Sequence, residues 1–328
     1  MRVHILDDWF DTLRTLPSFA RLAGHEVTVW NDHVEDLDEL ARRLAGAEAL
    51  VLFRERTPIT GQLLDRLPAL RLISQRSVYP HVDVDACTRN GVLLCSNMHA
   101  DTPSAAAAEL TWALILAAAR QLPQQMASLR AGHWRMGVGQ TLEGRRLGLY
   151  GYGRIARKVA GYARAFGMDV VWWASDAGRA RAAADGVMLA PDRRAFFAGC
   201  DFVSLHVRLK PETRGIITFD DLSAMQPKAS FINTSRAALV APGALLAALD
   251  AGRPGAAAVD VFESEPLMNP ADKLLAHPRV IATPHIGYVT EDELDLQFAD
   301  IYDQINAYAA GTPIHTINPQ VLQAGGRP

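Results

Sequence analysis

Residues 151–156 have the sequence Gly-Tyr-Gly-Arg-Ile-Ala, which directly follows the apolar run Leu147–Tyr150 and opens a helical stretch. Gly151 permits a tight turn, and Gly153 lets the backbone approach a pyrophosphate. Ala156 is small enough for close contact between helix and strand, and the N-terminus of the helix offers unpaired N–H groups to phosphates. The pattern predicts a dinucleotide-binding loop. The alternative is an ordinary glycine-rich turn.

The residues after the next apolar run bear on the choice between NAD and NADP. The run Val170–Ala174 ends in alanine, where an acidic residue that bonds the ribose hydroxyls is expected for NAD. Asp176 follows two positions later and is a candidate for this contact. Ser175 and Arg179 are candidates for holding the 2′-phosphate of NADP, unless Arg179 belongs to a solvated helix face. NAD is the expected cofactor, and NADP stays possible.

Four polar motifs lie at or near the ends of later strand-like runs, where ligands bind in doubly wound sheets. They are His206-Val-Arg-Leu-Lys-Pro-Glu-Thr213, Asn233-Thr-Ser-Arg236, Asp260-Val-Phe-Glu-Ser-Glu265-Pro266 and Thr283-Pro-His285-Ile-Gly287. Together with the glycine loop, they closely resemble the D-2-hydroxyacid dehydrogenase family. That family includes phosphoglycerate dehydrogenases, hydroxypyruvate and glyoxylate reductases and D-lactate dehydrogenases. The resemblance extends from about residue 50 to residue 318, with the motifs in the family's order.

The resemblance implies hydride transfer between NAD(P)H and a 2-keto acid or D-2-hydroxy acid. Reduction of a carbonyl needs a proton donor that titrates near neutrality, which points to histidine. By resemblance, His285 is the acid/base and the Glu265 carboxylate bonds its other ring nitrogen. Arg236 would orient the substrate carboxylate and carbonyl with a permanently charged fork of donors. Taken singly, each of the three also has a structural explanation.

The resemblance also implies a set of cofactor contacts. Asp260 is expected near the nicotinamide carboxamide, and a structural role explains His206 equally well. With the residues argued above, the expected cofactor contacts are Gly151, Gly153, Arg154, Ile155, Ser175, Asp176, His206, Val207, Thr213, Thr234, Ser235, Arg236, Asp260, His285 and Gly287.

Substrate recognition is where the sequence departs from the family. Many members carry Gly-Val-Gly after the fourth strand, and its N–H groups bind the substrate carboxylate; here the stretch is Gln75-Arg-Ser-Val-Tyr-Pro80. Upstream, Arg54-Glu-Arg56-Thr resembles the phosphate-binding loop of phosphoglycerate dehydrogenases, and arginines at i and i+2 in extended backbone point to one side. The alternative is that they pair with nearby surface carboxylates. The expected substrate contacts are Arg54, Arg56, Ser77, Val78, Arg236 and His285.

Short β-rich runs alternate with helical stretches around these residues. The runs of the first part are Val3–Leu6, Glu26–Trp30, Ala49–Phe53 and Leu72–Gln75, separated by helical stretches at Trp9–Ala23, Val34–Ala45 and Gln62–Leu67. Those of the middle part are Leu147–Tyr150, Asp169–Trp173, Phe202–His206, Ser230–Asn233, Ala257–Val261 and Val280–Ala282. Longer helices are expected over Pro103–Ala131 and Glu291–Ala310. This order predicts parallel sheets covered on both faces.

The predicted fold is therefore α/β, with two doubly wound parallel-sheet domains. The resemblance implies a Rossmann domain at residues 102–287, inserted into a flavodoxin-like substrate domain formed by residues 1–101 and 288–328. It also implies a homodimer assembled through residues 103–144.

Length and composition agree with this picture. A chain of 328 residues suggests two domains, and its net charge of −3 provides no basic field for nucleic acid or acidic membranes. The longest apolar run, Leu110–Ala119, is too short to span a membrane, and the N-terminus lacks the apolar core of a signal peptide. Cys87, Cys95 and Cys200 suggest neither a disulfide framework nor a metal site. A cytoplasmic protein is expected.

Two other functions share this scaffold. One is a corepressor-like sensor that binds NAD(H) with little turnover, and the other is a dehydrogenase of formate or phosphite. Turnover of 2-keto acids would separate both from a 2-hydroxyacid dehydrogenase.

Overall fold

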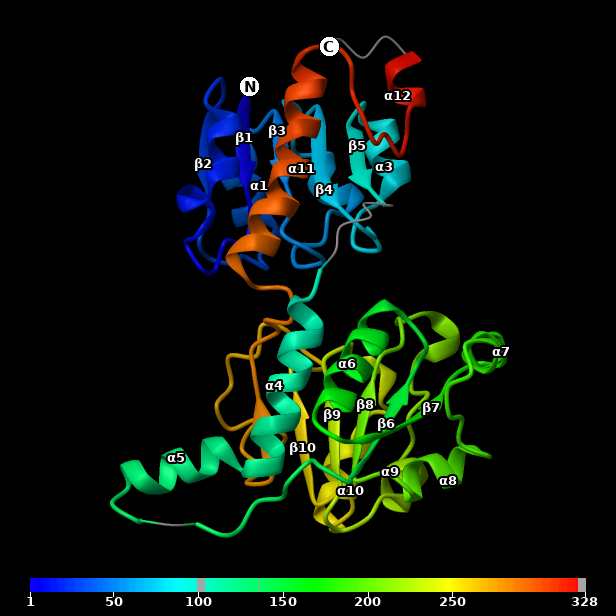
Figure 1. The fold of residues 1–328 in the computed structure, drawn as a ribbon. Helices are drawn as coiled ribbons and strands as arrows, with labels where there is room; N and C mark the ends of the chain where they lie inside the picture. Colours follow the sequence, from blue (N-terminus) through cyan, green and yellow to red (C-terminus); the bar gives the residue numbers. More distant parts are fainter. Residues whose placement is uncertain (99–103, 135, 324–328) are drawn as a thin grey trace. The chain divides into compact units, whose positions relative to one another are not determined.

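The computed structural model describes residues 1–98, 104–134 and 136–323, and the chain divides into two compact units (Figure 1). Unit 1 consists of Met1–Pro103 and Val289–Pro328, and unit 2 consists of Ser104–Tyr288. Each unit is built on one sheet of parallel strands. The predicted class, two parallel-sheet α/β domains, is confirmed.

The sheet of unit 1 has five strands in the order β2-β1-β3-β4-β5, which is the flavodoxin-like order. Its strands are β1 (Arg2–Ile5), β2 (Glu26–Val29), β3 (Ala49–Val51), β4 (Leu72–Arg76) and β5 (Leu93–Asn97). The four strands expected from the sequence are present, and β5 is an addition.

Helices cover both faces of this sheet. The core of one face joins Leu50, Ile73 and Leu94 to α1 (Leu37–Leu44), α2 (Gly61–Leu64) and α3 (Val84–Arg89). On the other face, α11 (Glu291–Ala309) contacts β4, and the short helix α12 (Gln320–Gln323) follows it.

The helical stretch expected at Trp9–Ala23 is present only in part. The stretch Trp9–Ala23 forms two short 3₁₀ helices, η1 (Leu13–Thr15) and η2 (Pro17–Leu22), instead of one α-helix. Pro17 has no N–H to donate to the preceding turn and begins the second helix.

The sheet of unit 2 has six strands in the order β11-β10-β9-β8-β6-β7. They are β6 (Arg146–Tyr150), β7 (Asp169–Trp173), β8 (Phe202–Leu205), β9 (Ser230–Asn233), β10 (Ala256–Val259) and β11 (Val280–Ala282), and all six were expected. An isolated bridge between Trp172 and Leu189 adds one more parallel partner outside β7. With this partner counted as the third strand, the order begins 3-2-1-4-5-6, as in dinucleotide-binding sheets.

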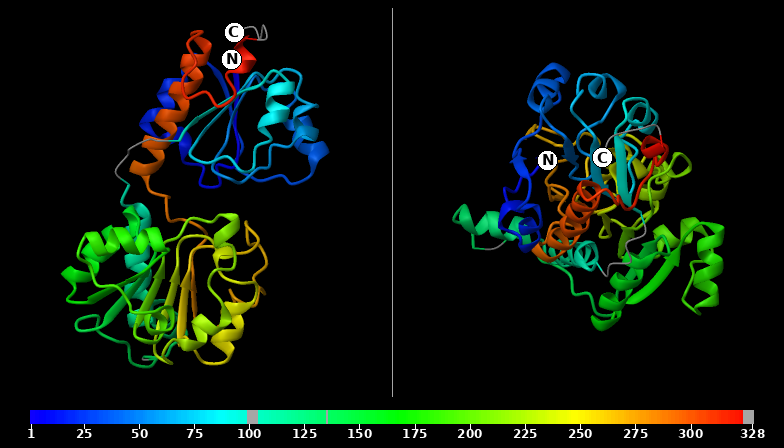
Figure 2. Two further views of the ribbon diagram at one scale, coloured as in Figure 1. Left: turned by 90° about the vertical axis from the view of Figure 1, so that its right-hand side faces the viewer. Right: turned by 90° about the horizontal axis from the view of Figure 1, so that it is seen from above.

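Helices cover both faces of this sheet (Figure 2). Alternate side chains of its strands enter two cores on opposite faces. Leu147, Leu149 and Ile232 pack with α4 (Ala106–Arg120) and α6 (Arg154–Ala165), whereas Tyr150 and Phe231 pack on the other face. Further helices of unit 2 are α7 (Asp176–Ala184), α8 (Arg193–Ala198), η3 (Pro211–Thr213), α9 (Phe219–Ala224), η4 (Ala237–Leu239) and α10 (Ala244–Asp250).

The prediction of a single long helix over Pro103–Ala131 is wrong. Within the described residues, α4 ends at Arg120, and Gln121, whose φ of 52° is left-handed, separates it from α5 (Leu122–Arg130), which continues in a new direction (Figure 1). Pro123 lies in the first turn of α5, where its missing N–H costs no hydrogen bond. Among the helices that the structure describes, none has the length and apolar character needed to cross a membrane.

Candidate active site

The loop between β6 and α6 leaves room for a phosphate. Gly151 has a φ of 115°, and a Cβ there would lie 2.3 Å from the carbonyl oxygen of His206. A Cβ on Gly153 would meet no described atom within 4 Å, so the chain is open on that side. Among the residues that the structure describes, no side chain caps α6, so N–H groups at the start of this helix can face a ligand. Ala156 is fully buried, as helix–strand contact requires. These residues fit the pyrophosphate of a dinucleotide.

Arg154 and Ile155, in the first turn of α6, are both exposed. Both are among the expected cofactor contacts, and they directly follow Gly153, which is open on one side.

The residues after β7 already have partners within the chain. Ser175 caps α7 by accepting a hydrogen bond from the N–H of Gly178 at 3.3 Å. Asp176 is almost fully exposed and pairs with Arg179 at 2.5 Å, while the Arg179 guanidinium lies 4.5 Å above the ring of Trp173. The three side chains suggested for ribose or phosphate contact therefore also have local structural roles.

The segment after β8 holds two of the expected cofactor residues by internal hydrogen bonds. Ser204 Oγ and His206 Nε2 are 2.9 Å apart, and burial lowers the pKa of His206 to about 4. Thr213 Oγ1 donates to the carbonyl of Arg208 at 2.8 Å, which closes the turn before η3. Val207 contacts the glycine loop, because a Cβ on Gly151 would lie 3.2 Å from its Cγ2. His206 is neutral at physiological pH.

A polar turn after β9 presents Arg236. The side chain of Asn233 bridges the turn, since its Nδ2 donates to the carbonyl of Arg236 at 3.1 Å and its Oδ1 accepts from the N–H of Ser235 at 3.0 Å. Ser235 Oγ donates to the carbonyl of Leu205 at 2.7 Å. Thr234 Oγ1 lies 2.7 Å from Thr111 Oγ1 of α4. The turn is thus fixed to two neighbouring elements.

Asp260, directly after β10, holds the loop that carries His285. Its side chain is fully buried and accepts hydrogen bonds from Thr283 Oγ1 at 2.6 Å and from the N–H groups of Ile286 and Gly287 at 2.9 Å each. Burial raises the pKa of Asp260, and these three donors oppose that shift. A Cβ on Gly287 would lie 3.1 Å from the Asp260 carboxylate, so only glycine fits there without displacement.

His285 and Glu265 form a hydrogen-bonded acid–base pair in unit 2. His285 Nδ1 lies 2.5 Å from Glu265 Oε2, and Glu265 Oε1 accepts from the N–H of Phe262 at 2.9 Å. The carboxylate is therefore anchored at one oxygen and orients the imidazole with the other. This leaves Nε2 as the ring nitrogen that can exchange a proton with a bound molecule. The Tyr288 ring lies edge-to-face with the imidazole, with centroids 5.8 Å apart.

In unit 1, the expected anion-binding residues follow β3. Arg54 and Arg56 are both half-buried, and Arg54 has a left-handed φ of 62°. Arg54 and Arg76 line a cavity of about 10 Å³, room for about one water, together with Phe298 of α11. The sequence did not single out Arg76. Its position at the last residue of β4, one residue before Ser77, is the signal that was available.

Ser77 and Val78 follow β4 and are half-buried. The N–H of Ser77 extends the sheet ladder by donating to the carbonyl of Asn97 at 3.2 Å, and Ser77 has a φ of 78°. A left-handed residue at this position turns the chain without glycine.

Comparison with known proteins identifies the family. The family model for the NAD-binding domain of D-isomer specific 2-hydroxyacid dehydrogenases matches residues 112–287, more than half of the chain. This chain belongs to the D-isomer specific 2-hydroxyacid dehydrogenase family. The resemblance stated from the sequence is confirmed, and the family description gives NAD as the cofactor of this region.

Individual members of the 2-hydroxyacid dehydrogenase family agree over most of the chain. The D-3-phosphoglycerate dehydrogenase of Methanocaldococcus jannaschii is 36% identical over 84% of this chain and 52% of its own length. The glyoxylate reductase of Thermococcus litoralis is 32% identical over 91% of this chain and 92% of its own. The crystal structure of a phosphoglycerate oxidoreductase from Vibrio cholerae has 45% identity and a TM-score of 0.89, covering 95% of this chain and 99% of that one. The chain spans about half the length of the curated phosphoglycerate dehydrogenases it matches.

Proposed function

We propose that this chain is an NAD(H)-dependent oxidoreductase that interconverts a 2-keto acid and the corresponding D-2-hydroxy acid. The observation that carries the proposal is the 2.5 Å contact between His285 Nδ1 and the anchored carboxylate of Glu265. A histidine held in this way presents Nε2 in a fixed direction, as proton transfer to a carbonyl oxygen requires. Membership of the family and the names of its relatives support the same reaction.

The mechanism assigns a task to each residue of the site. When bound, NAD(H) supplies or accepts the hydride at the substrate's second carbon. His285 donates a proton from Nε2 to the carbonyl oxygen during reduction and accepts it during oxidation, and Glu265 stabilises the imidazolium. Arg236, on its fixed turn, orients the substrate carboxylate and polarises the carbonyl.

The cofactor would be held by the residues around the open side of Gly153. The N–H groups at the start of α6, with Arg154 and Ile155, face the pyrophosphate in this proposal. Asp176 bonds the ribose, and Asp260 contacts the carboxamide side. The other proposed cofactor contacts are Gly151, Ser175, His206, Val207, Thr213, Thr234, Ser235, Arg236, His285 and Gly287.

Unit 1 would recognise the substrate's anionic groups. We assign this role to Arg54, Arg56 and the loop of Ser77 and Val78, and we assign cofactor binding to unit 2.

We also propose a homodimer assembled through residues 103–144, and a reducing, cytoplasmic location. The location is supported by Cys87, Cys95 and Cys200, which are buried and free. Burial raises the pKa of each thiol to about 12.

The test of the proposed reaction is steady-state oxidation of NADH and NADPH, side by side, over a panel of 2-keto acids. The panel includes glyoxylate, hydroxypyruvate, phosphohydroxypyruvate and bulkier keto acids. Turnover of any of them supports the proposal, and the preferred nucleotide decides between NAD and NADP. Tight NADH binding without turnover would favour the sensor function, whereas oxidation of formate or phosphite would favour the other dehydrogenase class.

The Arg54→Ala variant tests the anion-binding role within the same panel. Loss of the guanidinium should raise KM for phosphohydroxypyruvate about tenfold or more, because a charged hydrogen bond to phosphate is removed. KM for glyoxylate, which has no phosphate, should change by less than about threefold and serves as the internal control. An unchanged KM for the phosphorylated substrate would refute the role.

A further inference from the structure

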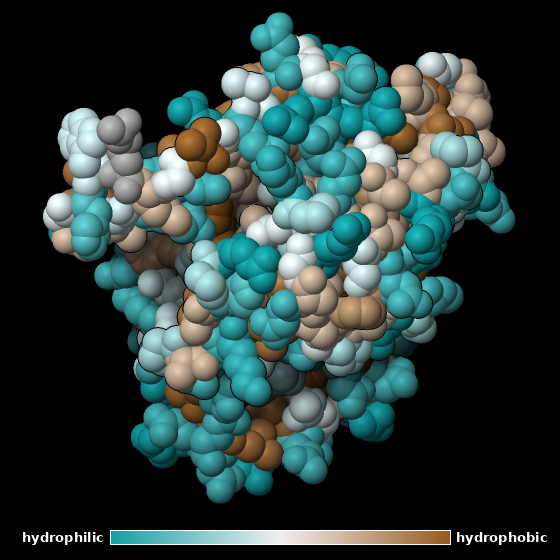
Figure 3. All heavy atoms as spheres, turned by 90° about the horizontal axis from the view of Figure 1, so that it is seen from below, coloured by the Kyte–Doolittle hydropathy of each residue, from teal (hydrophilic) through white to brown (hydrophobic). Residues whose placement is uncertain are grey.

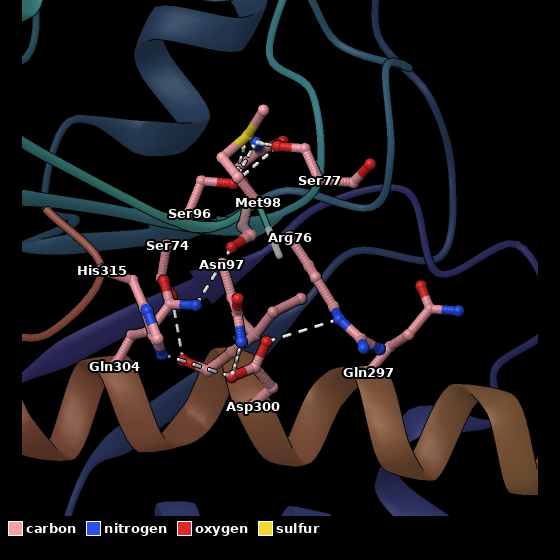
Figure 4. Close-up of polar contacts among 12 residues, drawn as sticks. Ser74, Arg76, Ser77, Ser96, Asn97, Met98, Gln297, Asp300, Gln304 and His315 are labelled. Atoms are coloured by element: carbon pink, nitrogen blue, oxygen red, sulfur yellow. Dashed lines mark hydrogen bonds and ion pairs between the residues drawn. The ribbon is translucent and has the colours of Figure 1, made fainter. Parts of the chain in front are cut away.

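A buried polar network connects the end of β4 to α11 within unit 1 (Figure 4). Ser74 and Gln304 are fully buried, and Ser74 Oγ donates to Gln304 Oε1 at 3.0 Å. Gln304 Nε2 donates to the main-chain carbonyl of Gln75 at 3.2 Å. Arg76 lies 3.4 Å from the carboxylate of Asp300. These contacts hold the last residues of β4 against the helix.

The side chain of Gln75 extends from this network to the loop that follows β4. Gln75 is 1% exposed. Its Nε2 lies 2.9 Å from the carbonyl oxygen of Ser77, 3.4 Å from that of Val78 and 2.9 Å from Ser96 Oγ. Ser96 Oγ in turn donates to the Ser77 carbonyl at 2.7 Å. The Ser77 carbonyl therefore points inward and accepts two hydrogen bonds.

The orientation of these carbonyls fixes the orientation of the N–H groups that follow them. In a trans peptide the C=O and the next N–H point in opposite directions, and both peptides of this loop are trans. With the carbonyls of Ser77 and Val78 turned toward Gln75, the N–H groups of Val78 and Tyr79 point away from it. Neither of these two amides donates a hydrogen bond to any residue that the structure describes. The amide of Ser77 differs, because it donates to Asn97.

We infer that Gln75 is a positioning residue for substrate binding, because its buried amide presents the N–H groups of Val78 and Tyr79 as the donor pair for the substrate carboxylate. The inference rests on the proposed function. It replaces Ser77 by Tyr79 in the expected pair of amides, and it explains how a loop without glycine turns two successive N–H groups to one side. Two such groups form the kind of concavity that binds anions.

The hydrogen bonds of Gln75 argue against a purely stabilising role. Its Oε1 is buried without a hydrogen-bond partner among the described residues, which is an energetic cost to the fold. Among the described residues, its Nε2 donates only to the carbonyls of Ser77 and Val78 and to Ser96 Oγ. Because methionine has a similar shape and no unsatisfied oxygen, we expect Gln75→Met to fold and to lose only the control of the loop carbonyls.

The decisive measurement is the binding of oxamate, a small 2-oxo carboxylate, to the enzyme–NADH complex of the full chain. Gln75→Met should weaken oxamate about tenfold or more, because the amides that meet the carboxylate are no longer aligned. Its Kd for NADH should stay within about twofold of wild type, since the NAD-binding region lies in unit 2. Ser96→Ala removes one of the two donors to the Ser77 carbonyl and should have a smaller effect.

Gln304→Met is the matched control. Gln304 is a buried glutamine of the same network, but its amide does not bond the loop carbonyls of Ser77 and Val78. It should lower stability and leave oxamate affinity within about threefold. Equal losses in Gln304→Met and Gln75→Met would mean a structural effect, and either that result or normal oxamate binding by Gln75→Met overturns the inference.

The variant Gln75→Glu adds a second measurement, the pH dependence of oxamate affinity, which would not change if Gln75 had only a structural role. A protonated carboxyl group donates one hydrogen bond to the loop, whereas the carboxylate repels the carbonyl oxygens. The oxamate affinity of Gln75→Glu, divided by that of wild type at each pH, should therefore fall as pH rises. A ratio that is independent of pH contradicts the inference.

Failure of the proposed function gives a different result. A wild-type enzyme that neither turns over any 2-keto acid nor binds oxamate overturns both the function and this inference. Normal wild-type turnover with an unaffected Gln75→Met overturns the inference alone.

Discussion

At the residue scale, His285 is held from two directions. Its backbone has a left-handed φ of 54°, a conformation that costs a non-glycine residue about 1 kcal/mol or more. The hydrogen bonds of Asp260 to Thr283, Ile286 and Gly287 keep the loop in this conformation. Glu265 fixes the ring. The imidazole is therefore oriented before any substrate binds, which reduces the reorganisation that proton transfer needs.

Replacing His285 tests its role as the acid/base. His285→Gln should lower kcat by about 10²–10⁴, the usual contribution of a positioned proton donor. The Kd for NADH, measured by fluorescence, should change far less than kcat, because one proposed cofactor contact is lost while the phosphate-binding loop is untouched. Retention of near-normal turnover would show that another group transfers the proton.

His206 predicts a specific dependence of stability on pH. Its pKa is lowered from 6.5 to about 4 by burial, so between these values the unfolded chain binds a proton that the folded chain does not. Stability is therefore unaffected above pH 6.5 and falls as pH decreases toward 4, by up to about 3 kcal/mol. Thermal unfolding of wild type and His206→Gln should diverge over this window, with wild type losing more. Parallel curves would contradict a His206 that stays neutral in the folded chain.

Several features of single residues could not be predicted from sequence. The candidate residues Glu265, Asp260, Arg54 and Arg236 could be named from the sequence because carboxylates and arginines have characteristic chemistry. In contrast, the left-handed backbone of Arg54, Ser77 and His285 occurs at non-glycine residues, whose sequence carries no signal for it. The hydrogen bond from the Ser77 N–H to the Asn97 carbonyl likewise depends on the register between β4 and β5, which the sequence does not reveal.

At the scale of elements, the turn between β6 and α6 separates two roles of glycine. Gly151 needs both its φ of 115° and the space next to His206, whereas Gly153 needs neither within the folded chain. The first glycine is required by the protein itself. In the proposed function, the second is required only when the cofactor's phosphate occupies the open side.

A pair of variants checks this division. Gly151→Ala should lower the free energy of unfolding of the unliganded protein by several kcal/mol, because its Cβ would lie 2.3 Å from a backbone oxygen. Gly153→Ala should leave that stability nearly unchanged and weaken NADH binding about tenfold or more. Chemical denaturation and NADH fluorescence titration measure the two quantities. Equal NADH affinity in Gly153→Ala and wild type would exclude close approach of the cofactor at this residue.

The strands were predictable because they are nearly continuous apolar runs, as parallel strands buried on both faces must be. The helices were less predictable than the strands. Apolar periodicity continues through Gln121, but the left-handed backbone there ends α4, and Pro17 divides the stretch that was expected to be one helix. Breaks of this kind depend on local backbone conformation, which hydrophobic periodicity does not report.

At the scale of the whole molecule, α5 and described residues that follow it expose several apolar side chains. None of the side chains of α5 is buried, and Leu122, Met126 and Leu129 lie on one face of the helix. Trp134 and Val138 are 81% and 90% exposed. Figure 3 shows this segment projecting from unit 2 with apolar residues among polar ones. Exposed apolar side chains of this number are typical of an interface.

The proposed homodimer can be tested on this segment. Met126→Glu combined with Leu129→Glu should convert the dimer to a monomer, because two charges would be buried in the interface without partners. Ala127→Glu, which adds a charge beside that face, is the control and should remain dimeric. Sedimentation velocity gives the mass of each variant. A monomeric wild type, or a dimeric double variant, would place the interface elsewhere or remove it.

The division of unit 1 between two distant parts of the chain has a consequence for biosynthesis. Ser96 and Leu94 of β5 pair with His315 and Ile317, and Ser74 of β4 bonds the carbonyl of Ile301. When the ribosome has produced the first hundred residues, the partners of this sheet do not yet exist. Unit 2, which is contiguous, can complete its core first. Until residues 291–318 emerge, one face of the unit 1 sheet and the edge of β5 remain uncovered on the nascent chain, where a chaperone or another copy can reach them.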